Sequence, residues 1–189
     1  METIERQKIK IWKESDKMWV MIFIALSLIG FGFITSSFKD ILNGLYEIII
    51  HPDALITDYI VIGGIGGAFV NSGILTLIII FLLWKNKIHF NGATFASLFL
   101  IAGFSFLGKN LLNIWAIIIG VYLFAKYHKQ PFARYIYIAL FGTAMAPIVT
   151  EIIFHFQLIL PLRIILGIIL GILIGFILPP LASHFLKVH

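Results

Sequence analysis

Several long hydrophobic runs dominate the sequence, and the longest covers residues 54–84. A run of about thirty residues is longer than the ~20 that a helix needs to cross a bilayer. Apolar residues make up 60% of the chain and charged residues only 12%, whereas soluble domains are about half apolar and a quarter charged. The sequence therefore predicts an all-α polytopic membrane protein.

The apolar runs divide the chain into about six predicted transmembrane helices. An amphipathic segment over residues 1–17 is expected on the cytoplasmic membrane surface, and residues 18–189 are expected to form a single transmembrane domain. A short interfacial helix is predicted over residues 38–50, where polar and apolar residues alternate with helical spacing. The predicted spans cover about residues 19–36, 54–84, 90–107, 111–125, 135–158 and 164–178, the last ending at Pro179-Pro180.

Three of the predicted spans contain residues that interrupt helices. Residues 63–72 read GGIGGAFVNS, residues 91–110 mix glycine with polar side chains, and residues 142–151 contain Pro147. Glycine weakens a helix by up to ~1 kcal/mol, and proline removes a backbone hydrogen bond. Two or three spans are therefore expected to be broken or re-entrant. For the glycines, close helix packing through small residues is an open alternative.

The distribution of basic residues predicts the topology. With six crossings and both termini in the cytoplasm, eleven of the 14 basic residues lie inside, and Lys39, Lys109 and Arg163 lie outside. We expect a multi-pass protein of the cell inner (plasma) membrane. Because the net charge of +5 is spread between hydrophobic runs, it gives no indication of nucleic-acid binding.

Polar side chains inside three of these runs, and in the short stretch after residue 107, predict a substrate site. Broken backbone and polar groups at membrane depth persist only where protein or water satisfies them, so these residues are expected to line a cavity. Asn91, Ser105, Lys109 and Asn110 should face that cavity, while Phe95, Phe99 and Phe106 pack on protein or lipid. A lysine that reaches the headgroups is the alternative for Lys109. The predicted substrate-binding residues are Asn71, Ser72, Asn91, Thr94, Ser105, Lys109, Asn110 and Asn113.

Glu151 and His155 are the candidates for proton or ion coupling. They lie four residues apart, on one helical face, within a predicted span. A carboxylate at membrane depth is costly and is usually retained for a function, although a structural pair within reach of Arg163 is the alternative. No zinc-binding motif is present, because the second histidine of a zinc-binding helix is missing and the chain has no cysteine. No catalytic residue, metal or cofactor is assigned.

Three blocks of sequence resemble an uncharacterised bacterial membrane-protein family known as a domain of unknown function (1576). The blocks are HPDALITDYIVIGGIGGAFVNSG, NGATFASLFLIAGFSFLGKNLLNI and ALFGTAMAPIVTE, in this order. Members of the family have about twice this length and two related halves, so the resemblance implies that this chain corresponds to an N-terminal half. It implies no activity and no functional residue.

These observations favour a transporter or channel subunit for a small polar or anionic solute, with a site between broken helices near the midplane. The alternatives are a membrane-embedded enzyme that uses Glu151 and His155, and a scaffold that packs through a glycine seam. That seam consists of Gly167, Gly171 and Gly175, at intervals of four. The expected partners are the lipid bilayer, the solute, and either a second copy in a homodimer or the second half of a longer chain.

Overall fold

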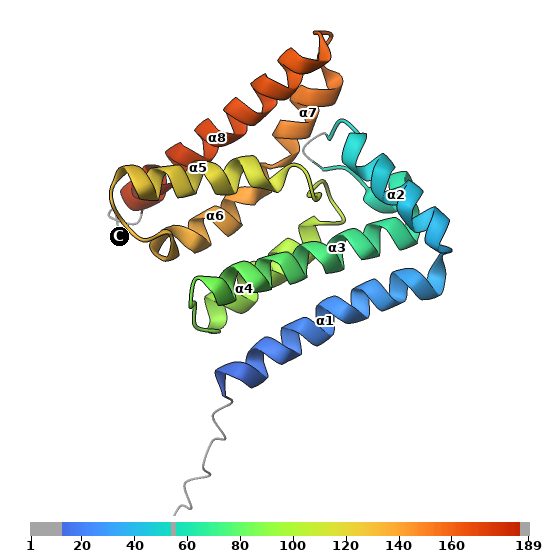
Figure 1. Ribbon diagram of the computed structural model, residues 1–189, viewed down its shortest axis with the longest axis horizontal. Helices are drawn as coiled ribbons and strands as arrows, with labels where there is room; N and C mark the ends of the chain where they lie inside the picture. The colour runs from blue at the N-terminus through green and yellow to red at the C-terminus, as the bar shows by residue number, and fades with distance from the viewer. Residues whose placement is uncertain (1–12, 54–55, 186–189) are drawn as a thin grey trace, which may run out of the picture.

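A computed structural model describes residues 13–53 and 56–185, and this part of the chain consists of helices without strands (Figure 1). Eight α-helices and two short 3₁₀ segments follow one another. They are α1 (Glu14–Thr35), α2 (Phe38–Ile50), α3 (Tyr59–Lys85), α4 (Gly92–Phe104), α5 (Ile114–Tyr127), η1 (Phe132–Tyr135), α6 (Ile136–Gly142), η2 (Thr143–Met145), α7 (Pro147–His155) and α8 (Leu160–Phe185).

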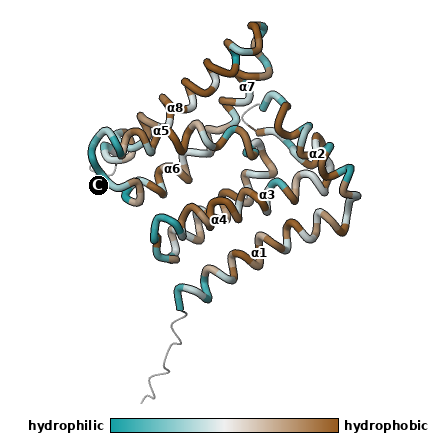
Figure 2. Tube along the Cα trace, in the orientation of Figure 1, coloured by the Kyte–Doolittle hydropathy of each residue, from teal (hydrophilic) through white to brown (hydrophobic). Residues whose placement is uncertain are grey.

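All six predicted apolar runs form helices, and the chain is an all-helical membrane protein. Within the described residues, four helical segments are long and apolar enough to cross a bilayer: Glu14–Thr35, Tyr59–Lys85, Phe132–His155 and Leu160–His184. Hydrophobic residues cover these helices, whereas hydrophilic residues gather at the connections (Figure 2). The other two runs form α4 and α5, with 13 and 14 residues. Helices of this length extend only about 20 Å, less than the ~30 Å of a bilayer core.

The predicted break in the second span lies at Gly64, whose φ of 69° and ψ of 169° are not helical. The hydrogen bonds show how sharply the chain bends there. The Tyr59 N–H donates to the Phe106 carbonyl at 3.0 Å, while the Asn71 amide donates to the neighbouring Ser105 carbonyl at 2.9 Å. In a straight helix, residues 59 and 71 would be about 18 Å apart. The first turn of α3 therefore folds back towards residues 105–113.

The predicted break in the fifth span is also present, between α6 and α7. The 3₁₀ segment η2 replaces α-helix over three residues, and Pro147 then occupies the first turn of α7, where its missing N–H costs no hydrogen bond. The Thr143 hydroxyl donates to the Leu140 carbonyl at 2.6 Å and so satisfies part of the interrupted backbone. This break turns α7 away from the line of α6 (Figure 1).

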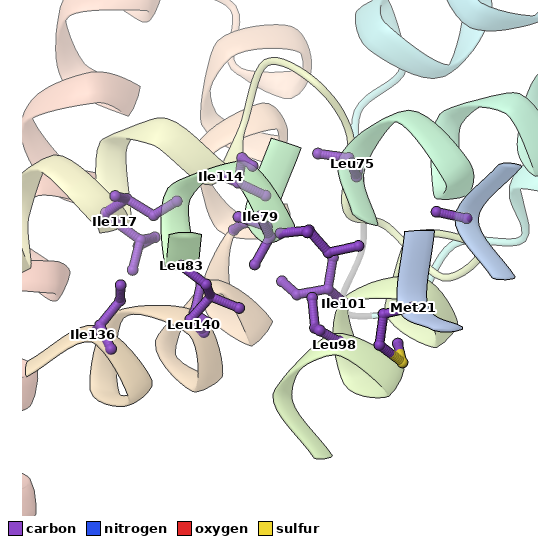
Figure 3. Close-up of a cluster of buried hydrophobic side chains, with 14 of the residues drawn as sticks. Met21, Leu75, Ile79, Leu83, Leu98, Ile101, Ile114, Ile117, Ile136 and Leu140 are labelled. Atoms are coloured by element: carbon purple, nitrogen blue, oxygen red, sulfur yellow. The ribbon is translucent and has the colours of Figure 1, made fainter. Parts of the chain in front are cut away.

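The main hydrophobic core lies where α3, α4, α5 and α6 meet, with Met21 of α1 at its edge (Figure 3). Its side chains are mostly aliphatic and fully or almost fully buried. Its α4 and α5 residues lie in the halves of these helices nearest the turn between them, so the core holds that part of both short helices against α3 and α6. The labelled residues are Met21, Leu75, Ile79, Leu83, Leu98, Ile101, Ile114, Ile117, Ile136 and Leu140.

The predicted glycine seam of α8 packs inside the chain, against α5 and α7. A Cβ atom on Gly167 would lie 2.9 Å from the Val149 carbonyl oxygen, and one on Gly175 would lie 3.0 Å from the Gly120 Cα. Gly171 packs on Ala116 in the same way. The seam that favoured a scaffold is thus used to join helices of one protein.

One predicted helix boundary is wrong, and one predicted segment overlaps the start of α1. Helix α8 does not end at residue 178 but continues through Pro179 and Pro180 to Phe185. Proline has a helical φ, so the pair removes backbone hydrogen bonds without ending the helix. Residue 17, the predicted end of the surface segment, lies inside α1, because α1 begins at Glu14. The rest of that predicted segment, residues 1–12, falls outside the described residues.

Candidate functional site

The turn between α4 and α5, residues 105–113, buries its polar side chains inside the protein, while Leu107 and Leu112 stay partly exposed. Lys109, Asn110 and Asn113 have at most 1% of their surface exposed. The two asparagines hold the turn together, because the Asn110 Oδ1 accepts from the Leu112 and Asn113 N–H groups and the Asn113 Oδ1 accepts from the Asn110 N–H, all within 3.0 Å. This reciprocal pairing satisfies the free N–H groups at the start of α5.

The side-chain amides of the same two asparagines point away from the turn and join it to other helices. The Asn110 Nδ2 donates to the Ile48 carbonyl of α2 at 3.2 Å and to the Tyr59 hydroxyl of α3 at 3.0 Å. The Asn113 Nδ2 donates to the Gly108 carbonyl at 2.8 Å and lies 3.2 Å from the Thr150 hydroxyl of α7. One turn thus contacts α2, α3 and α7.

The group at the centre of these contacts is the carboxylate of Asp53, in the connection between α2 and α3. Its Oδ2 accepts hydrogen bonds from the Tyr59 hydroxyl at 2.8 Å, the Thr150 hydroxyl at 2.5 Å and the Asn113 amide at 3.4 Å. Its Oδ1 is buried and has no hydrogen-bond partner in the described part of the chain. We refer to Asp53, Tyr59, Asn110, Asn113 and Thr150 as the Asp53 cluster.

The beginnings of three helices converge on this carboxylate. Tyr59 is the first residue of α3, Asn113 precedes the first residue of α5, and Thr150 lies in the first turn of α7. The positive ends of helix dipoles favour a negative charge at such a position. Burial acts in the opposite direction and is the larger effect. It raises the pKa of Asp53 from 3.8 to about 6, although the hydrogen bonds from Thr150 and Tyr59 lower it.

Lys109 is a second buried ionisable group, and it lies in the turn itself. Its side chain is 1% exposed, and its Nζ lies 5.0 Å from the centre of the Phe104 ring. Among the described residues, no ion pair involving Lys109 is present. A buried ammonium group has three donors and is costly without an acceptor. Phe104 supplies only a cation–π contact.

Three of the predicted site residues join α3 to α4. The Asn71 Nδ2 donates to the carbonyls of Ser105 and Lys109, both at 2.9 Å, and the Ser72 hydroxyl donates to the Ala102 carbonyl at 2.8 Å. The Ser105 hydroxyl donates to Ile101 within α4. These bonds satisfy carbonyls at the end of α4, which would otherwise lack partners. Among the side chains of these three residues, the Asn71 Oδ1 is buried without a hydrogen-bond partner in the described part of the chain.

Asn91 and Thr94 lie at the other end of α4, where they form a capping box. The Thr94 hydroxyl lies 2.7 Å from the Tyr137 hydroxyl at the start of α6 and donates to the His89 carbonyl at 2.8 Å. A helix of 13 residues separates this group from the turn by about 20 Å. The eight predicted residues therefore fall into two separate groups.

The predicted coupling pair lies beyond the Asp53 cluster, on α7. The His155 Nδ1 is 3.5 Å from the Glu151 Oε1, with the two side chains 68% and 34% exposed. Glu151 directly follows Thr150, so its charge acts on Asp53 and raises the Asp53 pKa slightly. The described residues contain no group of three side chains that could hold a metal ion.

Sequence reasoning missed Asp53, Tyr59 and Thr150. Asp53 was overlooked in the sequence because it follows His51-Pro52, which indicated an ordinary interfacial connection. The signal that could have found it is its place in the block HPDALITDY, one of the three on which the family resemblance depends. Tyr59 and Thr150 carry single hydroxyl groups within hydrophobic runs, a pattern that many packed membrane helices share.

The profile of one protein family matches residues 37–189, which is most of the chain. That family is described as "Protein of unknown function (DUF1576)". The chain belongs to this family. The match includes the whole Asp53 cluster, the α4–α5 turn and the Glu151–His155 pair. No curated protein and no solved structure matches the chain significantly.

Proposed function

We propose that this protein is a membrane transporter or channel subunit for a small polar or anionic solute, and that the α4–α5 turn forms part of the solute site. The observation that carries the proposal is the buried Lys109, which has no carboxylate partner in the described residues and adjoins the Asp53 cluster. Ionisable groups inside a membrane domain are rare, and they commonly mark the path of an ion or solute.

In this proposal, α4 and α5 form a re-entrant hairpin. Each helix is too short to cross the bilayer, and the far ends of both lie at the same end of the bundle, where Thr94 contacts Tyr137 and α5 connects to α6. Figure 1 shows these ends together on the left, with the turn near the middle of the molecule. A hairpin of this kind exposes irregular backbone only where protein or a water-filled space surrounds it.

The charges suggest which end is cytoplasmic. Basic residues gather at the end that contains the α3–α4 and α5–α6 connections, and fewer lie at the other end. The proposed location is the inner (plasma) membrane of the cell. The positive-inside rule then puts the first end, with both chain termini, in the cytoplasm. The first end holds Lys85, Lys87, Lys126, Lys129 and Arg134, and the second holds Lys39 and Arg163.

The chemistry of the turn supports a polar or anionic solute. Lys109 offers a cation and three donors, while two buried oxygens, Asp53 Oδ1 and Asn71 Oδ1, offer acceptors without donors. A small solute with a negatively charged or carbonyl group and a donor group would satisfy both kinds of atom. Discontinuous helices provide such sites in secondary transporters.

The test is solute flux into liposomes that contain the purified protein. Swelling would be followed by light scattering after a shift into urea, glycerol, formate or glycine. We expect faster swelling than in protein-free liposomes for at least one of these solutes, with the increase abolished in Lys109→Met and Asn110→Leu. Lys39→Met is the matched control, because Lys39 is an exposed lysine on α2. Rates equal to those of protein-free liposomes for all four solutes would contradict the proposal.

We further propose that the protein assembles as a homodimer, or with the second half of a longer chain. Helices α1 and α8 bury only a small part of their surfaces within the described residues, so both can pack against another subunit. Native mass measurement in mild detergent tests this expectation, and a population of monomers alone at all detergent concentrations would contradict it.

A further inference from the structure

The Asp53 carboxylate is asymmetric. Its Oδ2 accepts three hydrogen bonds, whereas its Oδ1 is equally buried and accepts none. An unpaired oxygen of a charged carboxylate, closed off from water, is among the most costly arrangements in a protein. The Oδ1 atom therefore requires a proton, a donor or water.

The ionisable groups around Asp53 come from every element that packs on it. His51 lies two residues earlier in the same connection, Tyr59 belongs to α3, and Glu151 belongs to α7. A positive charge on His51 favours the ionised form of Asp53, whereas the negative charge of Glu151 disfavours it. The asparagines of the α4–α5 turn are neutral, and the lysine of that turn, Lys109, makes no ion pair with Asp53 in the described part of the chain. Among these neighbours, no cation lies within ion-pair distance of the carboxylate in the described part of the chain.

We propose that Asp53 is a proton-binding site, with the proton carried by Oδ1. We further propose that the proton keeps Asp53, and with it the described residues of the α2–α3 connection, closed over the tip of the α4–α5 hairpin. Oδ2 has no room for the proton, because three donors already surround it. When the proton leaves Oδ1, the charged carboxylate gains free energy from water, so the connection moves away from the turn. Proton binding needs no assumption about transport, whereas its use in a transport cycle rests on the proposed function.

The linkage between proton binding and closure determines which arrangement each pH favours. The buried carboxyl has a pKa of about 6, above the 3.8 of a solvated aspartate, so the closed arrangement binds the proton more tightly than an open, hydrated one. Acid pH therefore favours the closed arrangement, and a pH above about 6 favours opening. The Tyr59, Thr150 and Asn113 hydrogen bonds would then break together, because all three end on one oxygen.

The direct test is infrared spectroscopy of the purified protein in lipid nanodiscs, with isotope-labelled aspartate. We expect a protonated-carboxyl band of aspartate that disappears with a midpoint near pH 6 and is missing in Asp53→Asn. Asp58→Asn is the matched control and should keep the band, because Asp58 is exposed and caps α3. Absence of the band from the wild type, or its persistence in Asp53→Asn, would overturn the proposal.

Two further variants keep Asp53 and test whether the protonated-carboxyl band belongs to it. They should shift the midpoint of that band in opposite directions. Thr150→Val removes a donor to the charged form, so the midpoint should rise; Glu151→Gln removes a nearby negative charge, so it should fall. A midpoint unchanged in both variants would contradict the assignment. These measurements do not involve solute, so they separate a failure of this inference from a failure of the proposed transport function.

Opening is measured by hydrogen exchange of residues 105–113 in wild type and in Asp53→Asn at equal pH. The neutral amide imitates the protonated carboxyl, and comparison at one pH cancels the intrinsic dependence of exchange on pH. We expect equal exchange at about pH 5 and faster exchange in the wild type at about pH 8. Equal exchange at both values would show that the proton does not hold the connection closed.

Discussion

The close packing of α2 on α3 is expected to hold the Asp53 cluster in position. A substitution at Gly44 tests this expectation. A Cβ atom at Gly44 would lie 2.9 Å from the Gly63 carbonyl carbon and 3.2 Å from the Gly67 Cα, and still closer to the Gly63 oxygen. Ordinary contact begins at 3.4 Å. All three atoms belong to backbone, so α2 must move outward by more than half an ångström.

This displacement should reach the cluster, because the Ile48 carbonyl lies one helical turn after Gly44 and accepts from Asn110 at 3.2 Å. Overpacking costs about 1–3 kcal/mol. A rigid backbone contact falls at the upper end of that range, and the better helix propensity of alanine offsets about 1 kcal/mol. We expect Gly44→Ala to lose about 2 kcal/mol, which corresponds to a melting temperature roughly 4–8 °C lower for a protein of this size.

The measurement is thermal unfolding in mild detergent, followed by tryptophan fluorescence. Gly30→Ala is the matched control, because a Cβ atom at Gly30 of α1 meets no atom within 4 Å. Its melting temperature should stay equal to that of the wild type or rise. Equal melting temperatures for the two variants would refute the close contact of α2 with α3.

Two other predictions concern single polar side chains. Asn71→Leu removes two hydrogen bonds to the end of α4 and should cost about 1–3 kcal/mol in thermal unfolding, whereas a residue that only binds solute would leave stability unchanged. The pKa of Asp53 is raised by burial to about 6, so the folded protein binds more protons than the unfolded chain between about pH 4 and 6. Stability should therefore fall, by up to about 3 kcal/mol, as the pH rises through this window, and Asp53→Asn should abolish that fall. A flat profile in the wild type would contradict the raised pKa.

The helices and their breaks could be predicted because local chemistry determines them. Six hydrophobic runs gave six helical segments, Gly64 interrupts α3 within the predicted GGIGGAFVNS, and Pro147 begins α7 next to a break. Two features depend on neighbouring helices and were therefore harder to predict from the sequence. The length of α4 and α5 is limited by the buried turn between them, and α8 continues through its two prolines.

The site was only partly predictable, for the same reason. The buried Lys109, Asn110 and Asn113 stood out in the sequence, because polar residues inside or directly beside a hydrophobic run are conspicuous. Their role in solute binding stays a prediction. Asp53 was missed, since its burial arises partly from contacts with residues distant in sequence, such as Thr150, which lies 97 positions away. Glu151 stood out more in the sequence, yet it lies partly exposed beyond the cluster. Sequence alone does not indicate which of two carboxylates is the more deeply buried.

The re-entrant hairpin is the central claim, and cysteine accessibility at its turn tests it most directly. Because the natural chain has no cysteine, single cysteines can replace Leu107, partly exposed at the turn, Asn43 on α2 and Lys129 in the α5–α6 connection. A membrane-impermeant maleimide is added to spheroplasts before and after permeabilisation. The account predicts labelling of Asn43→Cys from outside, of Lys129→Cys only after permeabilisation, and protection of Leu107→Cys from outside. Labelling of Leu107→Cys from outside as fast as that of Asn43→Cys would mean that α4 and α5 cross the whole membrane, and would contradict the account.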